Sequence, residues 1–260
     1  MATYNDEPRY LSVAIESIIK QSYLDWELIV VDDSNNISTI ETIDKYVEED
    51  KRIKVIRNNE KKYGFVPALN VGLETASGEY VGRMDGDDIS YPQRLEKEVK
   101  FLEDHSAVDV VGTQTAIIDE QGNRTSEIDF PAFGRKFRIF QMFRCPMQHG
   151  TILMRRSLLE EGIRYDESFK RSEDLELWLR LQKKGYQLYN IQEVLYDFRI
   201  EKGYAKKRSH NHFKYNVKAR KININWRHPL TSIMGLVIAS IYFIIPSKIK
   251  SLVYNVLNGR

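Results

Sequence analysis

The stretch Tyr80-Val81-Gly82-Arg83-Met84-Asp85-Gly86-Asp87-Asp88 places three carboxylates directly after a mostly apolar run that predicts a strand. Three carboxylates within four residues repel one another unless a cation neutralises them. An oxygen-preferring divalent ion such as Mg²⁺ or Mn²⁺ would do so, above all if diphosphate oxygens completed its coordination shell. A solvated acidic turn explains these four residues equally well when they are taken alone.

The composition limits the class of protein. A chain of 260 residues with 42% hydrophobic content can bury the core of one sizeable α/β domain and an appendage. Cys145 is the single cysteine, which excludes an internal disulfide, fits a reducing compartment and is expected to serve packing. Residues 202–260 hold twelve Lys/Arg and no Asp/Glu, which leaves 27 basic and 37 acidic side chains in residues 1–201. An acidic first part and a basic tail are expected to present different surfaces.

Hydrophobic periodicity predicts alternating helices and strands in the first third of the chain. Apolar residues recur at helical spacing from Leu11 to Ile19, with Asn5 or Asp6 as the expected cap. Residues 26–31 and 53–56 predict buried strands. Helices are predicted from a capping box at Ser38 and from Val66. This order predicts a mainly parallel sheet flanked by helices, the α/β fold class.

Acidic residues follow two of these strands. Asp33 comes after the strand at residues 26–31, and Asp85 after the strand at residue 80. Because ligands of parallel sheets bind beyond the carboxyl ends of the strands, both acids are expected at one rim. One acid can accept hydrogen bonds from a ribose hydroxyl or a base N–H while others hold the metal.

The middle of the chain predicts more strands. Residues 108–112, 115–118 and 150–154 read as strands, and Ser90 is the expected cap of a helix after Asp88. His149 stands alone before the last of these strands. A lone histidine is more often a structural hydrogen-bonding residue than a catalyst.

A second acidic motif is Ser172-Glu173-Asp174, followed by an apolar stripe that predicts a helix. A carboxylate in the first turn is favoured by the helix dipole, which keeps it ionised and able to act as a base. A capping pair is the alternative, and it is the better explanation of this motif alone.

Taken together, these residues resemble the family-2 nucleotide-sugar glycosyltransferases, which have the GT-A (Rossmann-like) fold. The resemblance covers residues 1 to about 205, the expected catalytic domain. Its motifs, in the order of the family, are Thr3-Tyr4-Asn5, Val31-Asp32-Asp33-Ser34, Asp85-Gly86-Asp87, and Glu173-Asp174 with Leu177-Trp178-Leu179. Each motif is weak alone, and the ordered set is specific.

The resemblance implies an inverting transferase that takes a nucleoside diphosphate sugar and a divalent cation, Mg²⁺ or Mn²⁺. It implies that the base and ribose are held by Thr3, Tyr4 and Asp33 with Glu7 nearby, and nucleotide and metal by Asp85 and Asp87. Asp174 would be the general base that deprotonates the acceptor hydroxyl, with Glu173 beside it. Lys207 and Arg208 belong to a basic cluster that would face the diphosphate.

Two departures from the family pattern stand out. A full apolar strand normally precedes Thr-Tyr-Asn, and here only Met1-Ala2 remain, so unpaired ladder groups and a groove beside the nucleotide are expected. The family also often has a histidine after the final strand, where this chain has Phe198-Arg199-Ile200-Glu201. Glu201 could replace it, His210 could arrive from further on, or the function could be absent.

Residues 206–260 are expected to form a basic helical tail. Leu230 to Ile245 is a sixteen-residue apolar stretch, which is shorter than the about 20 residues of a membrane-spanning helix. With the basic charges it suits an interfacial helix on an anionic cytoplasmic leaflet, and packing on the catalytic domain or on a partner subunit is an equal alternative. A partner nucleic acid is not expected, because no recognition motif accompanies the tail.

The expected protein is a cytoplasmic glycosyltransferase, peripheral on the inner face of the cell membrane. It would add a sugar to a lipid-linked glycan in surface polysaccharide assembly. A metal-dependent nucleotidyltransferase, which would release pyrophosphate, is the first alternative. The second is a membrane partner that binds nucleotide sugar without turnover.

Overall fold

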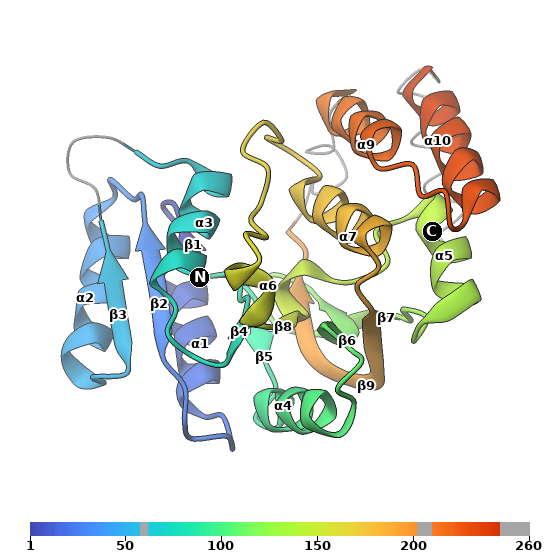
Figure 1. Ribbon diagram of the computed structural model, residues 1–260. Helices are drawn as coiled ribbons and strands as arrows, with labels where there is room; N and C mark the ends of the chain where they lie inside the picture. Colours follow the sequence, from blue (N-terminus) through green and yellow to red (C-terminus); the bar gives the residue numbers. More distant parts are fainter. Residues whose placement is uncertain (58–61, 202–209, 245–260) are drawn as a thin grey trace.

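The computed structural model describes residues 1–57, 62–201 and 210–244, and it contains two sheets with helices packed around them (Figure 1). The strands are β1 Ala2–Thr3, β2 Leu28–Asp32, β3 Ile53–Ile56, β4 Tyr80–Gly82, β5 Ile89–Ser90, β6 Val110–Ile118, β7 Arg124–Ile128, β8 Leu153–Arg155 and β9 Leu188–Arg199. The helices are α1 Pro8–Ile19, α2 Ile37–Glu49, α3 Phe65–Thr75, α4 Arg94–Asp104, α5 Gly134–Phe143, the 3₁₀ turn η1 His149–Thr151, α6 Ser157–Glu160, α7 Glu173–Lys184, α9 His210–Ile222 and α10 Pro229–Ile244.

The first sheet is parallel, in the order β1-β2-β3, as the sequence predicts. All five residues of β2 are buried because helices cover both faces of the sheet. Val30 packs into the cluster formed with α1 and α2, whereas Ile29 and Val31 pack with Ala68 of α3. This alternation is the period of two that a strand imposes, and it explains why β2 is apolar on both sides.

Strand β1 is two residues long and pairs with β2 in the register Ala2↔Val31. The β2 groups that face it are satisfied: Val31 N donates to Met1 O (2.8 Å) and Asp33 N donates to Thr3 O (3.0 Å). The unpaired ladder groups expected from a short first strand are therefore not found on β2. Within the described residues, β1 pairs with no strand of the second sheet, so the two sheets are separate in their hydrogen bonding.

The second sheet has the order β4-β8-β6-β9-β5, with β7 paired to β6. It is mostly antiparallel, and β6 with β9 is its one parallel pair. Residues 108–112 and 115–118 belong to one long strand, β6, rather than to two. Val110 packs in the cluster that contains Trp178 of α7, and Val111 packs with Leu102 of α4. The α/β class is thus confirmed, with parallel pairing concentrated in the first sheet.

Three predicted helix caps are wrong. The cap of α2 is Asn36, whose side chain accepts from Ser38 N (3.0 Å). Ser90 lies in β5, where its hydroxyl accepts from Gln21 Nε2 (3.0 Å), and α4 begins only at Arg94. Helix α1 has Glu7 at its cap position without a side-chain cap bond, because Asp6 faces the acidic loop after β4 instead.

The C-terminal helices α9 and α10 pack on the domain beside α5 and α7 (Figure 1). A Cβ at Gly235 would lie 2.8 Å from Arg220 Nη1 and 3.3 Å from Met142 Cα, so glycine allows α10 to approach this closely. The predicted apolar helix is therefore present, and one of its faces is covered by protein. In residues 1–57, 62–201 and 210–244, no helix has both the length and the apolar character needed to span a bilayer.

Candidate active site

The acidic loop after β4 is held in place by its last member. Asp88 is completely buried and accepts from Tyr196 OH and from Arg199 N, both at 2.8 Å. Arg199 Nε also donates to Asp87 O (2.8 Å), so β9 fixes the loop at two points. Asp88 is therefore a structural anchor, and Asp85 and Asp87 are the acids that remain for a ligand.

Glycine is required at position 150 for this anchor. A Cβ there would overlap the hydroxyl of Tyr196, the group that donates to Asp88. Gly150 lies in η1, just before β8, where the backbone comes close to the hydroxyl end of the Tyr196 side chain. The position of the acidic loop thus depends on a close backbone approach from a distant part of the chain.

Burial and mutual repulsion raise the pKa values of two acids in this loop, Asp87 and Asp88. The pKa of Asp87 is raised to about 6, first by burial and then by Asp85. Asp6 joins them: burial and the charges of Asp87, Asp85 and Asp32 raise its pKa to about 7. Glu201 also raises the pKa of Asp87, which places this residue near the acidic loop. The cluster is short of positive charge.

A divalent cation fits this donor set, because carboxylate oxygens that repel one another are the ligands of Mg²⁺ and Mn²⁺. In the part of the chain that the structure describes, no three acidic, histidine or cysteine side chains are arranged around one ion position. Both oxygens of Asp85 accept from the guanidinium of Arg83. Asp85 and Asp87 are thus candidate metal ligands, with Arg83 as a competing cation.

Arg83 is a residue that the sequence did not single out. Its side chain is 9% exposed. Burial disfavours its charge, but the paired Asp85 outweighs this effect and raises the pKa of the guanidinium. Its charge also lowers the pKa of Glu173 and of His149, so Arg83 acts on α7 and η1 as well as on the acidic loop. The sequence does contain a signal for this residue, because an arginine stands in an otherwise apolar run directly before the acidic residues.

The second acidic motif opens α7, as predicted. Ser172 adopts a left-handed conformation (φ 56°) before Glu173, which is 9% exposed. Burial and the neighbouring Asp174 raise the pKa of Glu173 to about 7, and Asp85 contributes to this shift. Because the charge of Asp85 acts on Glu173, the two acidic motifs lie in one site although they are far apart in the sequence.

Asp174 is held by two donors. Its Oδ2 accepts from Cys145 Sγ (3.3 Å), and its Oδ1 accepts from Leu175 N (2.7 Å). Burial and the charge of Asp174 raise the pKa of the Cys145 thiol well above its usual value, so it stays protonated and able to donate. Cys145 is therefore more than a packing residue: it orients the carboxylate of Asp174.

His149 has the structural role that a lone histidine suggests. Its Nε2 hydrogen-bonds to Tyr165 OH at 2.7 Å, and its Nδ1 lies 4.0 Å from Glu173 Oε1. Burial and the charge of Arg83 lower the pKa of the imidazole well below 6.5, so the ring is neutral. The neutral imidazole of His149 therefore does not offset a negative charge on Glu173.

Of the residues predicted to hold the base and ribose, Asp33 and Thr3 make hydrogen bonds within the protein, whereas Tyr4 is exposed. Asp33 accepts from Tyr63 N (3.0 Å) and Gly64 N (2.6 Å), so it ties the segment before α3 to the end of β2. Thr3 is buried and donates to Asp32 Oδ1 (3.2 Å), whereas the Tyr4 ring is 61% exposed. No interaction described in the structure links Asp33 to Asp87 or Asp174.

Of the other predicted residues, Glu7 is not brought to the acids. Glu7 lies on the surface, 3.8 Å from Arg9. Lys207 and Arg208 lie outside the described residues, as does the side chain of His210. The four acids Asp85, Asp87, Glu173 and Asp174 are therefore the members of the predicted site that the structure unites.

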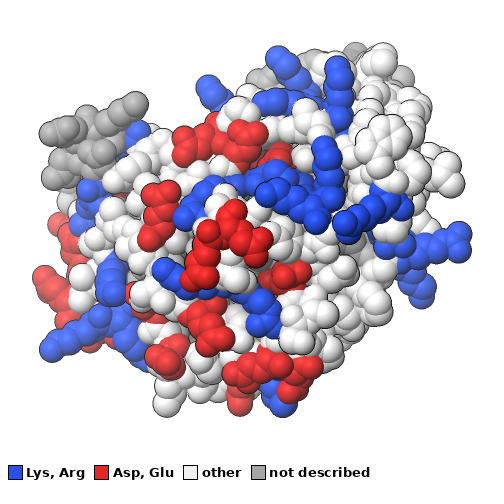
Figure 2. Space-filling view, in the orientation of Figure 1, with Lys and Arg blue, Asp and Glu red and all other residues white. Residues whose placement is uncertain are grey.

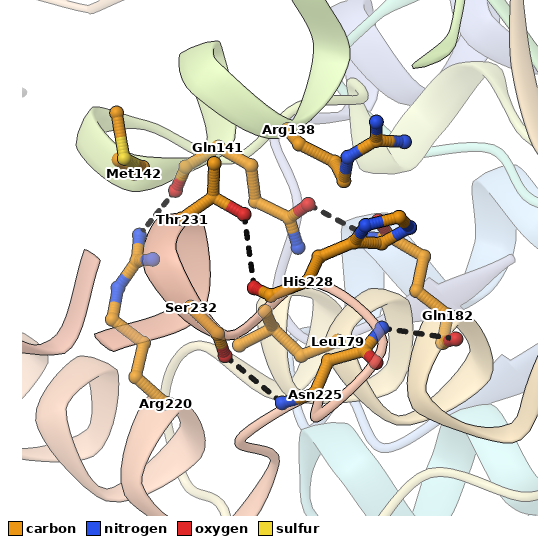
Figure 3. Close-up of a pocket in the computed structure, with 10 residues that line it drawn as sticks. All are labelled: Arg138, Gln141, Met142, Leu179, Gln182, Arg220, Asn225, His228, Thr231 and Ser232. Carbon is orange, nitrogen blue, oxygen red and sulfur yellow. Dashed lines mark hydrogen bonds between the residues drawn. The ribbon is translucent and has the colours of Figure 1, made fainter. Parts of the chain in front are cut away.

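A small cavity lies away from these acids, where α5, α7 and the segment that joins α9 and α10 meet (Figure 3). It has a volume of about 30 Å³, room for about one water molecule. Gln182 Nε2 donates to Gln141 Oε1 (2.9 Å) and Asn225 N to Ser232 Oγ (3.0 Å) across its walls. The cavity is a packing feature of the C-terminal helices, too small for a sugar.

Charges of both signs meet on one face of the molecule. Figure 2 shows Asp and Glu side chains gathered near the centre of this view, with Lys and Arg side chains directly beside them.

The fold is that of the GT-A glycosyltransferases. The structure of the mannosyltransferase PcManGT from Pyrobaculum calidifontis, in complex with GDP-Man and Mn²⁺, superposes with a TM-score of 0.68 over 99% of this chain and 78% of that chain, at 18% identity. Residues 1–163 match the family model "Glycosyl transferase family 2". The chain belongs to glycosyltransferase family 2.

Two relatives are similar in sequence. The putative glycosyltransferase EpsE of Bacillus subtilis (strain 168) is 40% identical over 222 residues, which cover 84% of this chain and 76% of that protein. The O-antigen biosynthesis glycosyltransferase WbnJ of Escherichia coli is 29% identical over 195 residues, 74% of this chain and 75% of that protein. The predicted family and fold are confirmed, and the enzyme is a glycosyltransferase with relatives in polysaccharide biosynthesis.

Proposed function

We propose that this enzyme moves a sugar from a nucleoside diphosphate sugar to a hydroxyl of an acceptor glycan, with inversion at the anomeric carbon and with the help of Mg²⁺ or Mn²⁺. The observation that carries the proposal is the union of two acidic motifs in one site. Asp85 accepts from the guanidinium of Arg83, and the charges of both residues act on Glu173 beside Asp174.

In the proposed reaction, the carboxylates at the start of α7 accept the proton of the acceptor hydroxyl. Asp174 accepts the proton of the attacking hydroxyl, while the Cys145 S–H and the Leu175 N–H hold its carboxylate in place. Glu173, whose pKa is raised to about 7, keeps a second proton-accepting group beside it. Attack from the face opposite the leaving group inverts the anomeric carbon, which is why a base separate from the donor side is needed.

The donor side would be formed by the acidic loop and the end of β2. Asp85 and Asp87 would hold the divalent cation, which supplies stabilisation of the negative charge on the departing diphosphate. The exposed ring of Tyr4 offers a surface on which a base can stack. The GDP-Man and Mn²⁺ in the similar mannosyltransferase support a donor and a metal of this class.

The test separates binding from transfer. Asp174→Asn is expected to abolish sugar transfer and to leave donor binding within about twofold, because the amide keeps the shape and cannot accept the proton. Asp87→Ala is expected to abolish the part of nucleoside diphosphate binding that depends on Mn²⁺. Calorimetry with a panel of nucleotide sugars, followed by product analysis, measures both.

Unchanged Mn²⁺-dependent affinity in Asp87→Ala would remove the metal assignment. If transfer persists in Asp174→Asn but is lost in Glu173→Gln, the general base is Glu173 and not Asp174. Release of pyrophosphate in place of a nucleoside diphosphate would indicate nucleotidyl transfer.

We further propose that the acceptor is a lipid-linked glycan of a surface polysaccharide and that the enzyme works on the cytoplasmic face of the membrane. The O-antigen biosynthesis relative supports such an acceptor. The outer face of α10 supports the location, because Leu230, Val237 and Ile244 are 80%, 51% and 78% exposed. An exposed apolar stripe with nearby basic residues suits an anionic lipid surface.

A further inference from the structure

Arg83 has a hydrogen-bonding group that the fold does not use. Its two terminal nitrogens donate to the two oxygens of Asp85. Its Nε–H is buried and has no hydrogen-bond partner. A buried charged group normally has every donor satisfied, and an unmet N–H costs free energy. An arginine that keeps a free donor inside a binding site is therefore a candidate ligand-binding residue.

The position of Arg83 indicates which part of a donor it would meet. Its guanidinium donates to Asp85 in the acidic loop, on the metal side, and its charge acts on Glu173 at the start of α7, on the acceptor side. The bond that breaks in the proposed reaction joins the sugar to the diphosphate, and it must lie between these two sides. The group at this point with the greatest negative charge is the phosphate attached to the sugar.

We propose that Arg83 binds the sugar-linked phosphate of the donor and neutralises it as the sugar leaves. This inference rests on the proposed function. When a cation takes Asp85, the planar guanidinium is free to turn its terminal N–H groups and its Nε–H to phosphate oxygens. Burial makes this interaction stronger than it would be in water. Arg83 would thus be a catalytic residue that contacts the leaving group.

The charges of the site agree with this role. Asp85 and Asp87 repel a diphosphate, and Asp6 adds to this repulsion. A divalent cation offsets two of these charges. Arg83, already inside the site, supplies the further positive charge that a diphosphate needs. In the absence of the donor, the pairing with Asp85 keeps the guanidinium from being an unpaired buried charge.

The experiment compares nucleotides that differ by the phosphate in question. Binding of UDP, UMP, GDP and GMP is measured by calorimetry with Mn²⁺ and with EDTA, for wild type, Arg83→Gln and Arg83→Lys. Arg135→Gln, on the exposed surface of α5, is the matched control for the loss of one positive charge. Arg83→Gln is expected to weaken binding of the preferred diphosphate by at least about tenfold, the loss of one charge-assisted hydrogen bond.

Binding of the monophosphate is expected to change by less than about threefold, and Arg83→Lys is expected to lie in between, since an ammonium keeps the charge but lacks the planar fork. Equal losses for diphosphate and monophosphate, or no loss for either, would overturn the inference.

Two outcomes concern the protein itself. If Arg83→Gln does not fold, as judged by its thermal unfolding, Arg83→Lys carries the test, with a diphosphate-specific loss of about threefold or more as the supporting result. If wild type binds neither UDP nor GDP with Mn²⁺, the proposed function fails, and the inference fails with it. If wild type binds UDP or GDP and both Arg83 variants bind it equally well, the inference about Arg83 is wrong while the proposed function stands.

Discussion

Single residues hold the acidic loop through buried hydrogen bonds. Asp88 accepts from Tyr196 OH and Arg199 N in a fully buried position. Asp88→Ala leaves both donors without a partner and is expected to lower the free energy of unfolding by about 2–4 kcal/mol. Asp88→Asn keeps an accepting oxygen and is expected to cost less than half as much.

Urea unfolding of the two variants and of wild type measures this difference. Circular dichroism of each variant controls for the fold. Equal stability of the Asn and Ala variants would mean that the two hydrogen bonds do not hold the loop.

At this scale the sequence was a partial guide to the site. The sequence identified four acids of the site, because neighbouring carboxylates at a strand end or a helix start repel one another unless a ligand or a cation offsets their charge. They are Asp85, Asp87, Glu173 and Asp174. Arg83 was missed because it stands in an otherwise apolar run, and Asp6 because a short acidic residue before a helix first suggests a cap. Their importance comes from tertiary neighbours, which spacing along the chain does not reveal.

Among the elements, α4 contains a carboxyl group that is expected to be neutral at pH 7. Glu98 is completely buried, neither of its oxygens has a hydrogen-bond partner, and burial raises its pKa to about 8. Arg94 Nε lies 3.9 Å from Glu98 Oε2, which is close enough to count as an ion pair. This distance is too long for a charge-assisted hydrogen bond, so burial decides the protonation state.

Wild type is therefore expected to lose stability as the pH rises from 4.5 to 8. In this range the unfolded chain releases the Glu98 proton while the folded protein retains it, because the folded pKa is the higher one. Glu98→Gln removes this penalty and is expected to gain about 2–4 kcal/mol over wild type at pH 8.5. At pH 4.5 the gain is expected to vanish. Thermal or urea unfolding at both pH values measures it, and a gain of equal size at both would contradict the assignment.

The elements were predicted more accurately than their pairing. Residues 53–56 form β3 as expected, and the predicted apolar tail helix is α10. The antiparallel pairing of the second sheet was not predicted, because strand order along the chain fixes direction only where a helix crosses between parallel neighbours. Strand β6 looked like two strands because Gly112 interrupts its apolar pattern, and only its partners β8 and β9 make it continuous.

On the scale of the whole molecule, the outer face of α10 is expected to attach the enzyme to anionic membranes. Val237→Glu with Ile241→Glu places two charges on side chains that are 51% and 54% exposed. Because these side chains are exposed, the fold is expected to persist while binding to vesicles of anionic lipid falls by at least about tenfold. Co-sedimentation with vesicles measures the binding.

The matched control is Leu24→Glu with Ile37→Glu, which puts the same charges on other exposed apolar side chains, 74% and 71% exposed. Equal loss of binding in both double variants would indicate a general charge effect and not a membrane-binding surface. Deletion of residues 226–260 is expected to move the protein to the soluble fraction of cells. Retention in the pellet would mean that another part of the chain is the anchor.

The geometry of the acidic loop requires that position 150 have no side chain. A methyl group there would collide with Tyr196 and displace the hydroxyl that Asp88 accepts. On the proposed function, a change at Gly150 is therefore expected to weaken binding of the nucleotide sugar, although Gly150 is not among the residues proposed to contact it. A survey of inactive variants would be expected to include this glycine, and a search confined to ligand contacts would overlook it.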